Sequence, residues 1–379
     1  MITAWWRRFF FGERDVRPLA LMRIGVGIIV MWMLLERVAV AEAALSDQGW
    51  LRSDAAEALM DPWHWSIFHT VDQPWAIAAL LFVGGGCALL FTVGLFTRYA
   101  GVVAFVILAS THVRNPAVLY GADSVARIWL FYLLLMPCGR AWSIDAIRAR
   151  IRTKGRAFRE RAATMESWPV RLLQFQVALV YLATGVSKAY GSDYHEGTAL
   201  WFALANPTYS RFYPLAEPVL SSAAPVLAVL TLVTLWWELA FAFMMPHRLT
   251  RRVALSIGVF VHGGIFVAMQ IQFWGPLMLL SYLSFVSGRA VQRFWIRHIR
   301  ETRDKRWAQR LVLHYDPEEA AATATAARVR SLDTFGLVRC VPEPKVQLRW
   351  SLASGESVPE PEVRARVRGV LPLVGRVFF

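Results

Sequence analysis

Polar side chains follow one face of an apolar segment that ends at Lys188. Counting back from Lys188 in alternating steps of four and three reaches Thr184, Tyr181, Val177 and Gln174, which share one face of a helix. All but Val177 can form hydrogen bonds. In a membrane helix, such a face normally contacts other helices and not lipid. We therefore expect this face to point into a helical bundle.

Two interpretations of Lys188 stay open. A lysine at the end of a membrane helix commonly extends its ammonium group to the water interface, which would make it a structural residue. If it is instead enclosed away from water, its ammonium group loses a proton more readily. The neutral amine could then act as a general base.

Three further ionisable residues, Arg23, Glu238 and His262, fall inside predicted membrane spans. Such groups are costly in a bilayer and usually face the bundle interior. Arg23 and Glu238 both lie in the inner halves of their spans, so they could pair. His262 shares a helix face with Gly258 and Phe266, which predicts a tight contact there. It could be a catalytic group, or it could form a hydrogen bond between helices. No second His, Cys or carboxylate lies at ligand spacing on the same face, so a metal site is not predicted.

Asp123 and Arg127 are four residues apart, a favourable spacing for an ion pair on a helix. For Asp123 we favour a structural pair at the start of a helix. Arg127 lies deeper in the same segment, and we include it among the residues that could support a polar site.

The composition indicates a membrane protein whose main partner is the lipid bilayer. Of the 379 residues, 56% are hydrophobic and only 18% are charged, fewer charges than a soluble domain carries. The net charge of +14 does not indicate nucleic acid binding, because the basic residues cluster between apolar runs, as on the cytoplasmic side of a membrane. The three cysteines form no CxxC pattern, so neither a disulfide framework nor a zinc site is predicted.

The apolar runs predict an all-α polytopic membrane bundle of about eight transmembrane helices. With the N-terminus inside, every strongly basic segment falls on the cytoplasmic side, as does the C-terminus, and Lys188 falls at the outer face. This predicts an integral protein of a bacterial inner or plasma membrane. The number of predicted spans depends most on the third and the fourth, which are short. The predicted spans cover 17–36, 75–96, 99–113, 124–137, 169–189, 219–245, 253–270 and 273–288.

Beyond the transmembrane domain at 1–288, the chain changes character. Residues 289–310 form a basic linker, and residues 311–379 form a small cytoplasmic α/β tail. A strand at 311–315, a helix at 320–332 and a strand at 337–341 predict a β-α-β unit. The Pro-containing residues after 341 are expected to be only partly ordered.

Several short motifs occur in a fixed order along residues 17–288. They are LALMRIG at 19–25, RNP at 114–116 with Asn115 at its centre, GAD at 121–123, PCGRAWSID at 137–145, YLATGVSK at 181–188, Glu196-Gly197, Glu238 and His262. Their order and spacing resemble the horizontally transferred transmembrane (HTTM) family. This is the membrane part shared with vitamin K-dependent gamma-carboxylase.

The resemblance implies that Lys188 is the base that deprotonates a reduced quinone. Two departures bear on this expectation. The carboxylase has a functional histidine in the loop matching 115–121, where Pro116 stands here, and its large lumenal domain has no counterpart. Gamma-carboxylation of protein glutamate is therefore not expected, and a quinone is implied by resemblance only.

The tail contains HYD at 314–316 and SLDTFG at 331–336. In these two motifs it is similar to the DCC thiol-oxidoreductase family, a thioredoxin-like unit. The positions of that family's CxxC pair are Glu319 and Ala322 here, so no dithiol exchange is expected. The tail would be a degenerate unit with a structural or docking role.

Two functions follow as hypotheses. The first is a membrane enzyme or modification factor whose outward-facing cavity uses Lys188 as base, with His262, Tyr181 and Arg127 as polar supports. Its substrate would be a lipid, a quinone or a secreted peptide. The alternative is a non-catalytic membrane scaffold, or an accessory protein for export or immunity. A transporter is not indicated, because no pair of broken helices recurs in two matching halves.

The predicted topology places Asp193 outside the cell, directly after the span that ends near Lys188. We expect Asp193→Cys to react with a membrane-impermeant thiol reagent added to intact cells. The same substitution at Arg98, in a predicted inner turn, should react only after the membrane is opened. Labelling of Asp193→Cys only in opened membranes would reverse the predicted arrangement.

Overall fold

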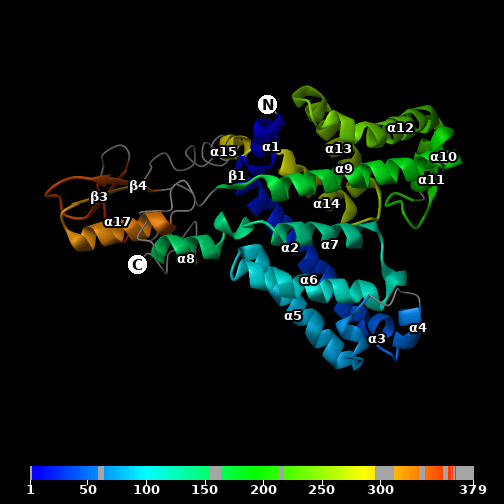
Figure 1. Cartoon of the computed structure of the whole chain (residues 1–379), viewed down its shortest axis with the longest axis horizontal. Helices are drawn as coiled ribbons and strands as arrows, with labels where there is room; N and C mark the ends of the chain where they lie inside the picture. The colour runs from blue at the N-terminus through cyan, green and yellow to red at the C-terminus, as the bar shows by residue number, and fades with distance from the viewer. Residues whose placement is uncertain are drawn as a thin grey trace.

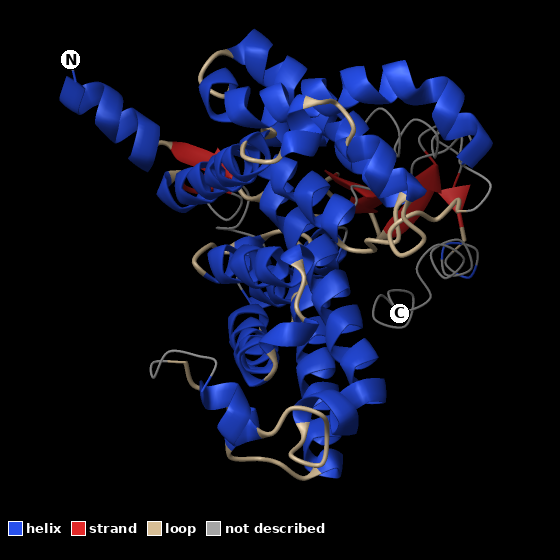
Figure 2. Cartoon of the chain, turned by 90° about the vertical axis from the view of Figure 1, so that its right-hand side faces the viewer, coloured by secondary structure: helices blue, strands red, loops and turns tan. Residues whose placement is uncertain are grey.

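The structure is a computed structural model that describes residues 2–58, 64–152, 164–213, 217–294, 311–332, 338–352, 357–359, 361 and 363. Helices make up most of the described chain, and strands occur in two small groups (Figure 2). The predicted linker at 289–310 lies largely outside the described residues, which end at 294 and resume at 311.

Five described helical segments are long and apolar enough to cross a membrane. The first comprises α2 and two short helices, and the others are single helices. Pro18, Pro74 and Pro169 lie in the first turns of α2, α5 and α9, where a missing N–H costs the helix nothing. The segments are 17–45 with α2 (Arg17–Glu36) and α3 (Ala41–Leu45), α5 (Pro74–Val93), α9 (Trp168–Ala189), α12 (Glu217–Met244) and α13 (Arg248–Ala268).

The other three predicted spans correspond to shorter or more polar helices that are not among these five. They are α6 (Thr97–Arg114), α7 (Gly121–Leu134) and α14 (Trp274–Ser281), the last continued by a 3-10 turn at Tyr282–Phe285. A helix of 14 residues spans about 21 Å, less than the roughly 30 Å of a bilayer's hydrocarbon core. The span count of eight therefore stays a prediction.

The helix α2 runs through the middle of the bundle, where it contacts α5, α7 and α14 (Figure 1). The contact with α5 is close: a Cβ at Gly27 would lie 3.2 Å from the Cα of Thr92. The N-terminal helix α1 (Ile2–Phe11) is tied to the start of α9 by an antiparallel ribbon of β1 (Glu13–Asp15) and β2 (Thr164–Glu166).

The described residues of the carboxyl-terminal part include a sheet of four strands. β3 (Leu311–Tyr315) pairs in parallel with β4 (Val338–Pro342), and α17 (Ala320–Leu332) lies between them in sequence. β5 (Arg349–Leu352) adds antiparallel to β3 and β6 (Ser357–Val358) to β5. The expected partial order after residue 341 stays a prediction, because most residues after 359 lie outside the described ranges. The helix α17 packs on α8 (Ile144–Arg152), which connects this sheet to the helical part.

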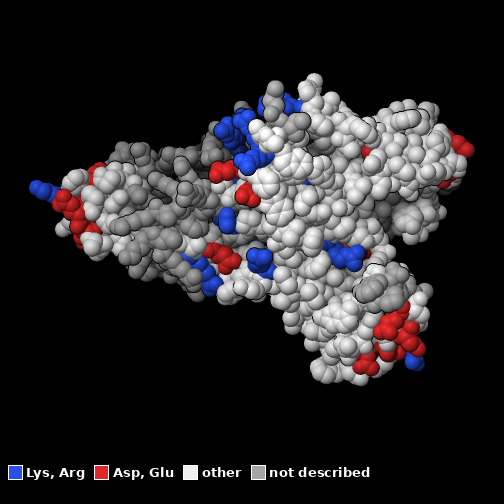
Figure 3. Space-filling view, in the orientation of Figure 1, with Lys and Arg blue, Asp and Glu red and all other residues white. Residues whose placement is uncertain are grey.

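Charge is distributed unevenly along the long axis of the molecule (Figure 3). Basic side chains gather around α1 and α15 (Gly288–Phe294), while acidic side chains gather at two tips on the right-hand side of the view, near α4 (Ser53–Ala58) and near α10 (Ser192–His195), and further acidic side chains lie at the left-hand end. The sheet of β3–β6 lies at the end of the molecule away from these acidic tips (Figure 1).

Arg23 is completely buried in α2, and its guanidinium group binds backbone oxygens, not a carboxylate. Nη1 donates to the carbonyl of Cys138 (3.0 Å) and Nη2 donates to that of Trp142 (2.6 Å). The possible Arg23–Glu238 pair is therefore wrong. The irregular turn after α7 leaves carbonyls without helical partners, and the arginine supplies their donors.

We expect Arg23→Met to lower the stability of the protein in detergent by at least about 2 kcal/mol. The substitution keeps the apolar volume but leaves buried carbonyls without donors, each at a cost of about 1–3 kcal/mol. Thermal unfolding would measure the effect against Arg52→Met, whose side chain is 70% exposed. Equal stability of the two variants would contradict this role.

Candidate functional site

The site forms where α9 meets α12. Gly185 allows this approach, because a Cβ there would lie 3.0 Å from the backbone nitrogen of Leu239. Three residues later, Lys188 lies opposite Glu238 of α12. Its Nζ is 2.6 Å from both carboxylate oxygens of Glu238, and the two side chains are 25% and 7% exposed. This pair joins the two helices.

A second polar group joins α9 to α13. The hydroxyl of Tyr181 lies 2.6 Å from Nε2 of His262 and 2.5 Å from the hydroxyl of Tyr282. Gly258 makes room for this arrangement, since a Cβ there would overlap the Tyr282 hydroxyl. Tyr181 and His262 are 1% and 2% exposed, and Nδ1 of His262 has no hydrogen-bond partner among the described residues.

The rest of the polar face of α9 also contacts protein. The side-chain amide of Gln174 donates to the carbonyl of Ser284 (2.7 Å), and Val177 is fully buried. Thr184 donates to the carbonyl of Val180 in its own helix (2.9 Å), so it supports the backbone and not the site. These are the contacts expected of a face turned toward other helices.

Lys188, Glu238 and His262 line one cavity of about 1020 Å³. Its walls come mainly from apolar residues of α11 (Ala199–Ala205), α12 and α13, and from the chain around 268–274. Tyr194 also lines it, with the centre of its ring 5.8 Å from Nζ of Lys188. A largely apolar cavity with a few converging polar groups is the usual form of a small-molecule site.

The cavity has a second polar group on its wall, around Asp123. Arg37 forms an ion pair with Oδ1 of Asp123, and the backbone N–H of Tyr120 donates to Oδ2 (3.0 Å). All three residues line the cavity. Behind them lies His112, 1% exposed, with Nε2 at 3.8 Å from Oδ1 of Asp123 and no hydrogen bond to either ring nitrogen among the described residues.

Asp123 is thus in a structural pair at a helix start, but its partner is Arg37. The ion pair with Arg127 that the spacing predicted is wrong, because Arg127 has no carboxylate at ion-pair distance among the described residues. Arg127 and Arg23 do not line the cavity. The long side chain of Arg37 reaches α7 from the end of α2, whereas Arg127 lies one turn deeper.

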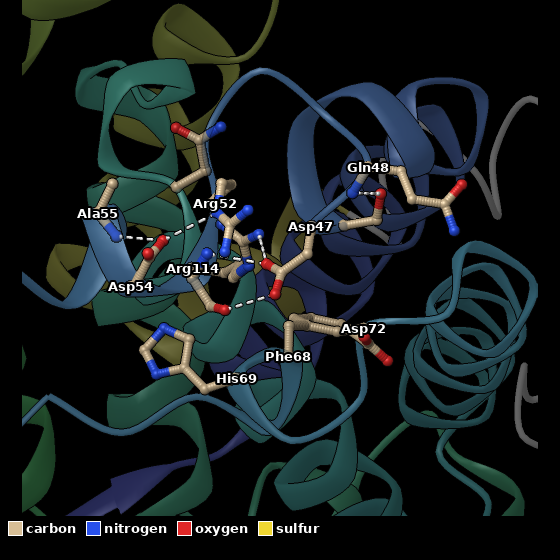
Figure 4. Close-up of polar contacts among 12 residues, drawn as sticks. Asp47, Gln48, Arg52, Asp54, Ala55, Phe68, His69, Asp72 and Arg114 are labelled. Atoms are coloured by element: carbon tan, nitrogen blue, oxygen red, sulfur yellow. Dashed lines mark hydrogen bonds and ion pairs between the residues drawn. The ribbon is translucent and has the colours of Figure 1, made fainter.

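Asn115 is also outside the cavity, and it holds the chain after α6 against the end of α3. Its amide donates to the carbonyl of Ala44 (2.7 Å), and its oxygen accepts from the N–H of Ala117. The preceding residue, Arg114, is fully buried and donates to Asp47 (2.9 Å), as Figure 4 shows. A hydrogen bond from Ser53 and the charge of Arg114 lower the pKa of Asp47.

A family model described as HTTM domain matches residues 11–288. The chain belongs to the HTTM family. The match contains every cavity-lining residue named above, and with the five long apolar helices it makes this chain a multi-pass membrane protein. No curated protein and no solved structure matches the chain.

Four residues of the HTTM site escaped the sequence analysis: Arg37, His112, Tyr194 and Tyr282. Arg37 follows the first predicted span, and His112 lies at the end of the third. The sequence shows that both side chains are ionisable, but it does not show which residues they contact. Tyr282 lies in an apolar run like many other aromatic residues, and nothing in the sequence distinguishes it. No group of three metal-ligating side chains occurs within the described ranges.

We expect a double-mutant cycle on Lys188→Met and Glu238→Gln to give a coupling energy of about 1–3 kcal/mol, because the partners are in contact and largely withdrawn from water. Unfolding of the purified HTTM protein in mixed micelles would measure it. The exposed pair Arg52–Asp54 is the control, with an expected coupling under about 1 kcal/mol. Equal coupling in both pairs would show that Lys188 and Glu238 remain hydrated.

Proposed function

We propose that this HTTM protein is a membrane-embedded enzyme that performs proton transfer on an apolar substrate held in the cavity. The observation that carries the proposal is the convergence of Lys188, Glu238 and His262, from three different helices, on one otherwise apolar cavity. Burying these groups is costly in a membrane protein, and such residues commonly mark the functional site.

The Lys188–Glu238 pair is the proposed proton acceptor. As an ammonium ion, Lys188 cannot accept a proton, but at 2.6 Å its proton can pass directly to Glu238. The neutral amine then takes the proton of a substrate O–H group, and the electron pair of that bond remains on the oxygen. The products are a protonated Glu238, an ammonium on Lys188 and a substrate oxyanion beside it.

His262 is the proposed second polar contact for the substrate. Its Nε2 is held by Tyr181, which is held in turn by Tyr282. This chain fixes the orientation of the imidazole ring, and Nδ1 is left without a partner among the described residues. Such a ring can bind a polar atom of a ligand without losing an existing hydrogen bond.

A quinone fits these residues as a class of ligand. The apolar walls suit a ring with a hydrocarbon tail, and Lys188 and His262 can hydrogen-bond its oxygens. In its reduced form, such a group supplies an acidic hydroxyl. The same cavity could also hold part of a lipid or of a secreted peptide. The resemblance to the carboxylase favours a quinone over both.

For the membrane arrangement, we retain eight crossings with both termini in the cytoplasm of a bacterial cell. The segregation of basic and acidic side chains along the molecule supports it. The division at 288 and 310 and the DCC-like nature of the tail are part of this proposal. The packing of α17 on α8 supports a docking role for the tail.

A scaffold or an accessory protein for export or immunity is the second candidate function. One observation favours it: the ion pair and the tyrosine–histidine chain each clamp α9 to a neighbouring helix. Purely structural groups would show the same contacts. The two functions differ in whether the proton on Lys188 must be able to leave.

Lys188→Arg separates these functions, because arginine keeps the positive charge but does not release its proton. In a deletion strain, we expect the wild-type gene to restore a lipid-soluble metabolite seen by mass spectrometry of membrane extracts. Lys188→Arg and Lys188→Met should each reduce it by about 100-fold or more, the usual contribution of general acid–base catalysis.

The control is Lys345→Arg, an exposed lysine of the tail, which should restore the metabolite fully. Full restoration by Lys188→Arg would exclude proton transfer at Lys188. If deletion leaves the membrane extract unchanged, the enzyme hypothesis fails and the scaffold is favoured.

A further inference from the structure

A second site lies away from the cavity, where α9 and α13 begin. Arg14 of β1 and Gln174 of α9 both donate to the carbonyl of Ser284, at 3.2 and 2.7 Å. Arg171 donates to the side-chain oxygen of Gln174 (2.9 Å). Arg14 and Arg171 are therefore held close together by one carbonyl and one neutral amide.

Arg251 of α13 adds a third positive charge to this group. Arg14, Arg171 and Arg251 each lie near enough to the other two to repel them, and Arg248 and Arg252 in turn repel Arg251. Nη1 of Arg251 donates to the carbonyl of Met245 (3.3 Å). We name Arg14, Arg171 and Arg251 the arginine cluster.

The charge of the arginine cluster is not balanced within the described ranges. None of its members forms an ion pair with a carboxylate there. The adjacent Asp15 is engaged by Arg17 at 2.5 Å. Burial and the charge of Arg251 lower the pKa of Arg14. The half-buried guanidinium groups bind carbonyls, an amide and, for Arg171, the ring of Phe9 at 4.0 Å, and they still have donors available for an anion.

The surface beside the cluster is apolar and belongs to the membrane. Phe175 and Leu179 follow Arg171 at steps of four, so they continue its face of α9, and they are 55% and 56% exposed. Arg171 and Arg251 lie in the first turns of α9 and α13, two helices long and apolar enough to cross a membrane, so we expect them at the level of the lipid headgroups. Basic pockets between helices at this level suit anionic lipid headgroups.

We propose that the arginine cluster binds the phosphate group of an anionic phospholipid, whose acyl chain lies along Phe175 and Leu179. Guanidinium groups bind phosphate oxygens in a bidentate manner, which suits two or three arginines around one headgroup. The lipid would join the N-terminal ribbon to α9 and α13. The proposal does not depend on the function of the cavity.

The test uses the full-length purified protein and graded additions of phosphatidylglycerol, with phosphatidylcholine as the neutral lipid. Native mass spectrometry counts the bound lipids, and thermal unfolding reports stabilisation. We expect the wild-type protein to retain phosphatidylglycerol selectively and to unfold at a higher temperature with it. Equal retention of phosphatidylcholine by the wild-type protein would by itself overturn the proposal.

The triple variant Arg14→Gln, Arg171→Gln, Arg251→Gln should bind phosphatidylglycerol at least about tenfold more weakly, given about 1 kcal/mol per basic residue near an anionic lipid. The control removes the same charge at the exposed Arg52, Arg98 and Arg349 and should bind as the wild type does. An equal loss in both triple variants would show a non-specific charge effect.

Competition by inorganic phosphate alone, at the concentration of the lipid, would assign the cluster to a free anion and overturn the lipid assignment.

Discussion

The ion pair between Lys188 and Glu238 is the contact on which the rest of the site depends. It lies at the edge of the cavity and joins α9 to α12, close to the approach that Gly185 allows. In a membrane, either charge alone would be costly, whereas together each satisfies the other. The pair therefore determines both where the helices meet and which charged groups a ligand encounters.

The same need to satisfy buried polar groups explains other features of the bundle. Arg23 supplies donors to carbonyls of the irregular turn after α7, and Asn115 does the same for the carbonyl of Ala44. In water, these carbonyls could bind solvent. Inside a membrane bundle, protein side chains must replace it. Charged residues in apolar spans are thus often structural, and position in a span alone does not distinguish them from catalytic groups.

Glycines determine the fine geometry of the site. At Gly258, the absence of a side chain leaves space for the Tyr282 hydroxyl, which completes the chain from His262 through Tyr181. The sequence indicated a tight contact at this glycine, since it shares the face of His262. It did not indicate what fills the space, because Tyr282 comes from another helix.

The sequence alone determined the class of protein, the HTTM family and the inward face of α9. These properties depend on composition, motif order and helical periodicity, which are local along the chain. Only the tertiary structure decided the partners of the charged groups: Glu238 binds Lys188 and not Arg23, and Asp123 binds Arg37 and not Arg127. Periodicity places a residue on a face of its own helix, but its partner depends on which helix packs against that face and at what height.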